Sequence, residues 1–300
     1  MFTTKNIHNN IMKQTFIIIA VLTGLVCTAM LTSCDVNIRT KDYRDSEKWG
    51  RVTTDTLELK PFTGIVVNAA VDIVLVQGEK MEVVVEGNEN AIDEYSYTVE
   101  DDELEENASI LVVDVARRLN YNLPSVRLHI VTPNIENITL NGSSDFDIKD
   151  SLTVGHLNIE VNGSGDIDIR QLKVQSAFSI HLHGSGDVTV RDLECQYLTA
   201  EVNGSGDADL RNVRYADETE LVTNGSGDID ATITGHTITA TAQGSGDIDL
   251  EVDCDELTIS SQGAGDVEIK GNTKVLRRSS TMLGTTTTKK LKAEKVIIKE

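Results

Sequence analysis

Val161-Asn162-Gly163-Ser164-Gly165-Asp166-Ile167 contains a tetrapeptide, Gly-Ser-Gly-Asp, that recurs through the second half of the chain. Complete copies begin at Gly163, Gly184, Gly204, Gly225 and Gly244, and near copies begin at Gly142 and Gly263. Successive copies start 19 to 21 residues apart. A nearly fixed period of this length indicates one supersecondary unit stacked on copies of itself. The repeat therefore predicts a solenoid.

Apolar and polar residues alternate on both sides of each tetrapeptide. In Leu157–Asn162 and in Asp166–Ile169 the apolar side chains fall on one face, and Leu172 adds a third inward position. No helical pattern separates these segments, and all three prolines precede residue 134, which leaves every later backbone N–H free to pair. The sequence therefore predicts an all-β fold, a parallel β-helix in which each turn, or rung, contains about 20 residues.

The predicted β-helix domain covers residues 56–275, with an irregular, β-rich part at 56–135 and regular rungs at 136–275. The acidic stretch 90–107 is the only place in the irregular part where a helical turn is expected. The segment Val67–Ile73 aligns with Val-Asn-Gly-Ser-Gly-Asp-Ile, which predicts a degenerate first corner at Asp72. Strands are expected at Thr63–Val67, Val71–Val76, Glu82–Glu86, Ile110–Val115 and Val126–Val131.

The repeat residues are interpreted as the structural corner of each rung. Glycine accepts a positive φ at a tight bend, and the residue before each corner, usually Asn, is expected to bond along its column. The inward residue that precedes this Asn position becomes smaller from rung to rung, from Val161 to Ser261. This predicts that the corner narrows or becomes wetter towards the C-terminus. The corner set is Gly163, Gly165, Asp166, Gly184, Gly186, Asp187, Gly204, Gly206, Asp207, Gly225, Gly227, Asp228, Gly244, Gly246 and Asp247.

The N-terminus is typical of an export signal. Lys13 precedes an uncharged apolar run from Phe16 to Leu31, and Leu31-Thr32-Ser33-Cys34 resembles a bacterial lipobox. Residues 1–33 are interpreted as a lipoprotein signal peptide, with translation starting at Met1 or Met12, and 34–55 as a tether. Cys34 is the predicted lipidation site, and an uncleaved anchor helix is the alternative. We expect an exported protein anchored by lipid, at the outer membrane, on its periplasmic or its surface side.

The chain is acidic, with 48 Asp and Glu against 27 Lys and Arg, which argues against a nucleic-acid partner. Residues 276–300 are basic and are interpreted as a capping segment; docking on the acidic body or on a neighbouring molecule is the alternative. Exposed solenoid ends and this tail make a homo-oligomer a further expectation. Cys195 and Cys254 fall three rungs apart, too far for a disulfide, and are expected to be buried.

The repeat, the lipobox-like segment and the opening Phe62-Thr63-Gly64-Ile65-Val66-Val67 resemble the exported DUF2807 proteins of Bacteroidetes. That family is described as "putative auto-transporter adhesin, head GIN domain". The resemblance covers Leu57–Lys270. It implies a right-handed β-helix and a role in the cell envelope, and the family brings no settled activity with it.

Two columns of acids follow from the repeat. The first holds the corner aspartates, which we expect to bond corner amides; the second holds Asp147, Asp168, Asp209, Asp230, Asp249 and Glu268, which we expect to be solvated. A calcium ladder is the alternative, with candidates Asp166, Asp168, Asp228, Asp230, Asp247 and Asp249. His181 and His183, with Glu160 and Glu201 on neighbouring rungs, are a second candidate metal group, for zinc or copper. The structural interpretation, with no cofactor, is preferred.

A ladder of identical carboxylates does not provide the single distinctive constellation that catalysis needs. No catalytic residue is therefore assigned. The expected function is that of a non-catalytic envelope lipoprotein, an adhesin or binding module whose flat faces contact glycans or envelope and matrix proteins. A carbohydrate-active β-helix enzyme, a polysaccharide lyase or hydrolase, is one alternative, and a calcium-binding scaffold is another.

Overall fold

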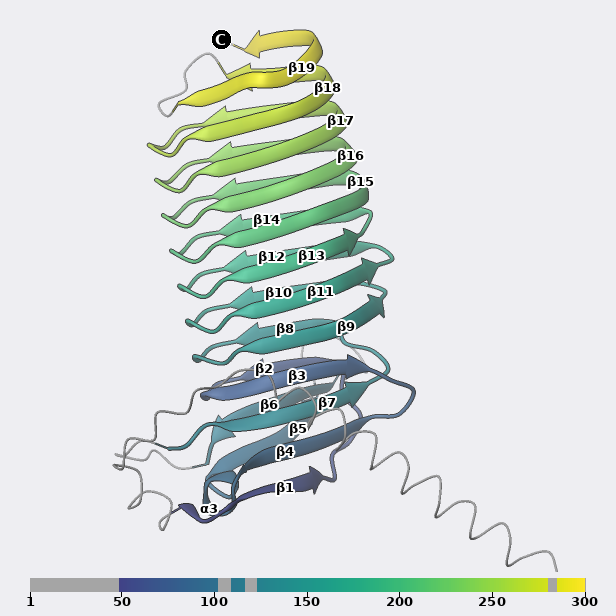
Figure 1. The fold of residues 1–300 in the computed structure, drawn as a ribbon, viewed down its shortest axis with the longest axis vertical. Helices are drawn as coiled ribbons and strands as arrows, with labels where there is room; N and C mark the ends of the chain where they lie inside the picture. Colours follow the sequence, from purple (N-terminus) through teal and green to yellow (C-terminus); the bar gives the residue numbers. More distant parts are fainter. Residues whose placement is uncertain (1–48, 102–108, 117–122, 280–284, 300) are drawn as a thin grey trace, which may run out of the picture. The chain divides into compact units, whose positions relative to one another are not determined.

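The computed structural model describes residues 49–101, 109–116, 123–279 and 285–299. Ser46–Glu300 forms one compact unit, which contains all of the described strands. This unit is a right-handed β-solenoid of about eight turns of roughly 20 residues (Figure 1). The predicted fold class is thereby confirmed. None of the described residues belongs to a helix of the length and hydropathy needed to cross a membrane.

The strands form two faces. Face A contains the strands that lead into a corner and those paired with them: β5 (Tyr95–Asp101), β6 (Ser109–Val115), β2 (Gly64–Val67), β8 (Asn137–Leu140), β10 (Leu157–Val161), β12 (Ala177–Leu182) and β14 (Tyr197–Val202). Face B contains the strands that leave a corner and those paired with them: β1 (Val52–Leu57), β4 (Glu82–Asn88), β7 (Val126–Thr132), β3 (Val71–Gln77), β9 (Phe146–Val154), β11 (Ile167–Val174) and β13 (Val188–Glu194).

From β15 onward, each rung is formed by one long strand that contributes to both faces. Each of these strands leaves a corner along face B, bends, and returns along face A, paired in parallel with its neighbours. They are β15 (Ala208–Thr223), β16 (Ile229–Ala242), β17 (Ile248–Ser261), β18 (Val267–Ser279) and β19 (Thr286–Lys299).

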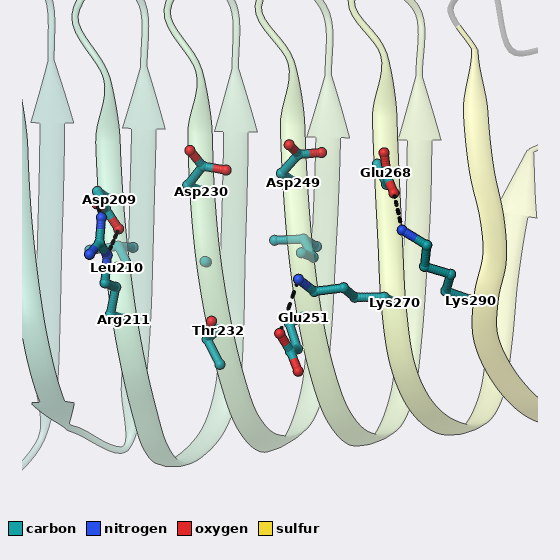
Figure 2. A pocket seen from close by; sticks show the side chains of 12 residues that line it. Asp209, Leu210, Arg211, Asp230, Thr232, Asp249, Glu251, Glu268, Lys270 and Lys290 are labelled. Carbon is teal, nitrogen blue, oxygen red and sulfur yellow. Dashed lines mark hydrogen bonds and ion pairs between the residues drawn. The ribbon is translucent and has the colours of Figure 1, made fainter.

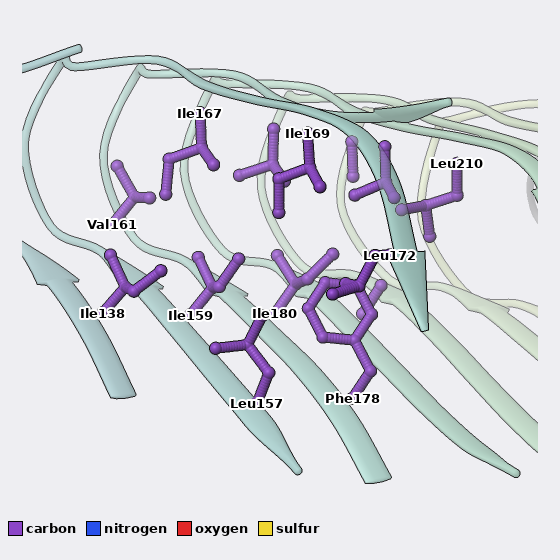
Figure 3. Packing of buried hydrophobic residues seen from close by; sticks show 14 of the residues in the cluster. Ile138, Leu157, Ile159, Val161, Ile167, Ile169, Leu172, Phe178, Ile180 and Leu210 are labelled. Carbon is purple, nitrogen blue, oxygen red and sulfur yellow. The ribbon is translucent and has the colours of Figure 1, made fainter. Parts of the chain in front are cut away.

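Inward residues stack on their counterparts in the next rung. Ile167 lies between Phe146 and Val188 in the parallel register, and all three are fully buried. Ile159 and Ile180 of face A point toward Ile167 and Ile169 of face B (Figure 3). The alternation read from the sequence thus produces one continuous core, because a strand period of two sends every second side chain inward.

The N-terminal part continues the parallel stacking of the solenoid through β2, β3, β6 and β7. β2 and β3 pair in parallel with β8 and β9, and Ile73 lies opposite Phe146, so Asp72 occupies the corner position of Asp145. This agrees with the degenerate corner expected from the sequence. On their other side β2 and β3 pair in parallel with β6 and β7. Beyond these strands the pairing changes: β4 is antiparallel to β7, and β5 is antiparallel to β6.

The helical turn expected within 90–107 is present as the short helix α3 (Glu89–Ile92). Two strands were not expected. β5 follows α3 in the same stretch. β1 begins at Val52, inside the expected tether 34–55, and Trp49 is also buried. Both β1 and β5 are edge strands that carry acids and threonines. The alternation of apolar and polar residues is therefore weak in their sequences.

The basic C-terminal segment adds a further rung. β18 crosses the expected boundary at residue 275, and β19 pairs with β18 in parallel from Thr286 to Lys299. Cys195 and Cys254 are free and buried, and burial raises the pKa of the Cys195 thiol to about 12. Cys34 and the rest of the predicted signal lie outside the described residues.

The side chains of the shrinking corner column stay buried towards the C-terminus. Thr223, Ala242 and Ser261 are all fully buried, and the hydroxyls of Thr223 and Ser261 have no hydrogen-bond partner among the described residues. A buried hydroxyl without a partner loses its hydration and gains nothing in return. The corner therefore carries a local cost in stability.

Replacing Thr223 by valine keeps the shape of the side chain and removes the unpaired hydroxyl. We expect Thr223→Val to raise the free energy of unfolding by about 1–3 kcal/mol. The matched control is Thr241→Val, at a partly exposed position, which should change it by less than about 0.5 kcal/mol. Urea denaturation of the Ser46–Glu300 fragment measures both. Destabilisation by Thr223→Val would mean that the hydroxyl has a partner.

Candidate functional site

The corner glycines are required by close backbone stacking. A Cβ placed on any glycine of the five complete tetrapeptides would lie 1.8–2.0 Å from a backbone carbonyl oxygen of the preceding rung. The sequence analysis expected a positive φ instead, and this is wrong. The described glycines with positive φ are Gly50 and Gly271, neither of which belongs to a corner. Glycine is needed here because two backbones approach closely, with no room for a side chain.

Amides stack beside these glycines. Asn141 Nδ2 donates to Asn68 Oδ1, and Asn162 Nδ2 donates to Asn141 Oδ1, each at 2.8 Å. Asn224 and Asn203 repeat the contact at 2.8 Å. His183 occupies one position of this column, where its ring nitrogen Nδ1 lies 3.3 Å from Asn203 Nδ2. The column links successive corners through side-chain hydrogen bonds.

The corner aspartates bond the backbone of the next rung. Asp166 Oδ1 accepts from the N–H of Asp187 at 2.9 Å, and Asp187 Oδ1 accepts from the N–H of Asp207 at 2.8 Å. The same bond continues along the column as far as Asp266, which accepts from Thr285. These are the corner-amide bonds that the structural interpretation assumed. Each one supplies a donor to a carboxylate that would otherwise face only like charges.

The second acidic column, on face B, is mostly ion-paired. Its members pair with a basic residue on the same or an adjoining rung: Asp147 with Lys149, Asp168 with Arg191, Asp209 with Arg211 and Glu268 with Lys290. Asp230 and Asp249 are different. Within the described part of the chain, neither carboxylate has an ion pair or a side-chain hydrogen bond.

A change in sequence explains this gap. Two residues after the second acid, or after Thr189 in its place, the rungs carry Lys149, Arg170, Arg191, Arg211 and Lys270, but Thr232 and Glu251 follow Asp230 and Asp249. On these two rungs the position therefore holds no Lys or Arg that could pair with the acid. The period alone made these acids look equivalent to the others; comparing the positions two residues further on would have separated them.

The unpaired acids lie in an open hollow of about 360 Å³ on face B (Figure 2). Asp209 and Glu268 flank them on adjacent strands, and Lys270 bonds Glu251 at 3.1 Å near the bend. The remaining polar lining comes from Arg211, Thr232 and Lys290. The hollow thus presents two free carboxylates beside several charged groups of both signs.

Burial and crowding disturb both carboxylates. Burial raises the pKa of Asp230 above its ordinary value, and the neighbouring charges of Asp249 and Asp209 raise it further. Burial also raises the pKa of Asp249, with added contributions from Glu268 and Asp247. Both causes disfavour the ionised form, so protonation of either group, or a positively charged ligand, relieves the repulsion.

The candidate metal ligands are not brought together. Asp166, Asp228 and Asp247 are occupied by corner amides, and Asp168 is occupied by Arg191. His181 lies between Glu160 and Glu201 as expected, 3.5 Å from the latter, whereas His183 stands in the amide column. Among the described residues no group of three or more His, Cys, Asp or Glu side chains is placed to hold a metal ion.

The comparisons with known proteins place this fold in a family. Residues 61–236 and 212–300 match the DUF2807 profile, described as "Putative auto-transporter adhesin, head GIN domain". The chain belongs to this family. The family description supports an adhesin-like role in coarse terms and does not name an enzyme. A search of curated proteins finds no match.

Three solved structures share the solenoid fold with this DUF2807 protein. A "putative adhesin" from Bacteroides fragilis is 24% identical, with a TM-score of 0.65 over 73% of this chain and 97% of its own. A "putative lipid binding protein" from Parabacteroides distasonis is 15% identical, with a TM-score of 0.57 over 84% and 98%. A "putative adhesin" from Parabacteroides merdae is 17% identical, with a TM-score of 0.54 over 84% and 97%.

The close stacking of the corners is tested by adding one methyl group. Gly206→Ala would place a Cβ 2.0 Å from the Gly186 carbonyl oxygen, so we expect a loss of about 3–5 kcal/mol in the free energy of unfolding, or no folding at all. Gly155→Ala is the control, because its Cβ would meet nothing within 4 Å. Thermal melting followed by circular dichroism compares the two. Equal melting temperatures would rule out the steric argument.

The crowded carboxylates predict a dependence on pH. Their folded-state pKa values are raised, so ionisation opposes folding above those values, and the opposition fades as the pH falls toward the unfolded value of about 3.9. Because both groups are largely exposed and solvent screens their repulsion, the double variant Asp230→Asn, Asp249→Asn should be more stable at pH 7 by no more than about 0.5 kcal/mol, and equal to the parent near pH 4.

Urea denaturation at the two pH values measures this difference. Asp168→Asn is the control, because it removes a carboxylate of the same column that is paired with Arg191. It should not stabilise the protein at pH 7. A stability gain for Asp230→Asn, Asp249→Asn that is the same at both pH values would contradict the assigned protonation.

Proposed function

We propose that the protein is an exported, lipid-anchored, non-catalytic adhesin-like module that binds an extended glycan through face B. The observation that carries this proposal is the hollow at Asp230 and Asp249, where the otherwise paired surface offers two free carboxylates. Free carboxylates accept hydrogen bonds from sugar hydroxyls without first breaking an ion pair. Family membership supports the adhesin-like role, and the Leu31–Cys34 segment supports the anchor at Cys34.

The shape of the site favours binding of a chain over enclosure of a small molecule. The hollow lies along parallel strands that repeat at about 4.8 Å, and it is open to solvent. A polymer laid across the rungs would meet a similar outward position on each one. The mixed charges suit a polar, hydrated ligand, and the same face also suits an extended segment of an envelope or matrix protein.

A carbohydrate-active enzyme is a second candidate for one specific reason. Asp230 and Asp249 lie on adjacent rungs, and both have raised pKa values, as a general acid requires. Lys270 is the nearest candidate base, but it is held by Glu251. Paired carboxylates of this kind serve glycoside hydrolysis when one is protonated. Binding is preferred because the site is open and water has free access to it.

A glycan array probed with the Ser46–Glu300 fragment tests the proposal, with and without calcium. We expect binding to a defined set of glycans, and about a tenfold or greater loss of affinity in the double variant Asp230→Asn, Asp249→Asn. The matched control is Asp147→Asn, Asp168→Asn, which alters the same column outside the hollow and should retain binding.

Each outcome separates the candidates. Binding without release of shorter products supports the adhesin-like module, whereas new reducing or unsaturated ends would identify an enzyme. Binding that requires calcium would support the calcium scaffold. No bound glycan, or an equal loss in the control variant, would contradict the proposed site.

A further inference from the structure

The last rung of the solenoid leaves core positions uncovered. Val296 continues the inward column of Leu257 and Leu276, and Ile298 lies in the column of Ile259, where Arg278 stands between them. Leu257 and Leu276 are 0% and 4% exposed, but Val296 and Ile298 are 53% and 52% exposed. In a solenoid each rung is covered by the next, and a terminal rung normally carries a polar outer surface. Here the aliphatic interior is open at the C-terminal end.

The backbone at this end is open as well. β19 pairs with β18 on one side, and in the described part of the chain it pairs with nothing on the other (Figure 1). An edge strand of this kind presents unpaired N–H and C=O groups and is a template for a further strand. Apolar side chains and free backbone groups together indicate a surface that another β-strand covers.

The charged side chains of β19 indicate which surface could cover it. Lys292 and Lys295 are exposed and, within the described residues, have no ion pair. At the opposite end of the solenoid the edge strands are β1 and β5, each of which pairs on one side among the described strands. Their exposed acids are Asp55, Glu58, Glu100 and Asp101, which outnumber the nearby bases Arg51 and Lys60. One end is therefore basic and the other acidic.

The two ends also match in geometry. The first half of β19 continues face B, where β1 is the edge at the opposite end, and its second half continues face A, where β5 is the edge. A second copy stacked along the solenoid axis would thus extend both faces at once. A two-fold contact between two C-terminal ends would instead place lysine beside lysine, which destabilises strand pairs.

We propose that copies of this protein associate head to tail, with β19 of one copy against β1 and β5 of the next. The contact buries Val296 and Ile298 and sets Lys292 and Lys295 against the acids of the neighbouring copy. Because the two surfaces differ, the contact does not close on itself, and repetition produces a filament along the solenoid axis. This inference does not depend on the ligand site proposed above.

Sedimentation velocity and light scattering of the Ser46–Glu300 fragment test the association. This fragment is one compact unit with all described strands and the whole described core. We expect species that grow beyond a dimer as concentration rises, and that shrink when salt screens the charges. A monomer at every concentration, or association confined to a dimer, would overturn the proposal.

Charge reversals identify the two surfaces. Lys292→Glu, Lys295→Glu and, separately, Glu58→Lys, Asp101→Lys, one acid at each edge strand, should each weaken the association about tenfold or more. The chain that carries all four changes should recover it, because the charges are complementary again. This recovery also shows that the variants remain folded. Arg170→Glu reverses an exposed charge on the side of the solenoid and should have no effect.

The same variants exclude other occupants. If the reversal at Glu58 and Asp101 leaves the association unchanged while that at Lys292 and Lys295 abolishes it, the C-terminal rung contacts a different surface. That result would overturn the head-to-tail arrangement. Failure of the four-fold variant to recover association would do the same.

Discussion

The corner stacking of this solenoid depends on a contact between backbones in which no side chain has room. A Cβ at a corner glycine would lie within about 2 Å of a carbonyl oxygen of the rung before it. The corners therefore stack directly on one another, and each rung must repeat the same bend in the same place. Once the corners are superposed, the residues beside them are superposed as well. Asparagine then bonds asparagine, and each corner aspartate bonds the next backbone amide.

Strict repetition creates an electrostatic problem, since it places like charges at strand spacing. The corner column solves it with backbone donors, and the second column solves it with Arg and Lys from the same or adjoining rungs. Asp230 and Asp249 are the members of the second column that have no Arg or Lys partner among the described residues. A repeat protein gains a distinctive site in this way, through a local departure from the pattern that holds the rest together. The departure leaves two neighbouring carboxylates whose repulsion no base of the described chain offsets by an ion pair.

The ends of the solenoid are a second departure from repetition. At the N-terminal end antiparallel strands, the helix α3 and the buried Trp49 replace regular rungs. At the C-terminal end β19 keeps the inward pattern without a rung above it, so core residues meet solvent. A solenoid has no intrinsic means of closing, and the acidic and basic ends of this one give it a polarity that the central rungs lack.

The sequence by itself determined the solenoid, the inward and outward columns and the degenerate corner at Asp72, because period and alternation are local properties that each rung repeats. It did not reveal β1 or β5, whose pairing is decided by distant strands, nor the reason for the corner glycines, which lies in the preceding rung. His181 and His183 are neighbours in sequence, yet they join different columns. The missing base two residues after Asp230 and Asp249 is visible in the sequence, but only the tertiary structure showed that, among the described residues, no base of another rung pairs with them and that Val296 and Ile298 are exposed. Ion pairing and burial depend on which rungs lie above and below, and the chain order of one rung does not contain that information.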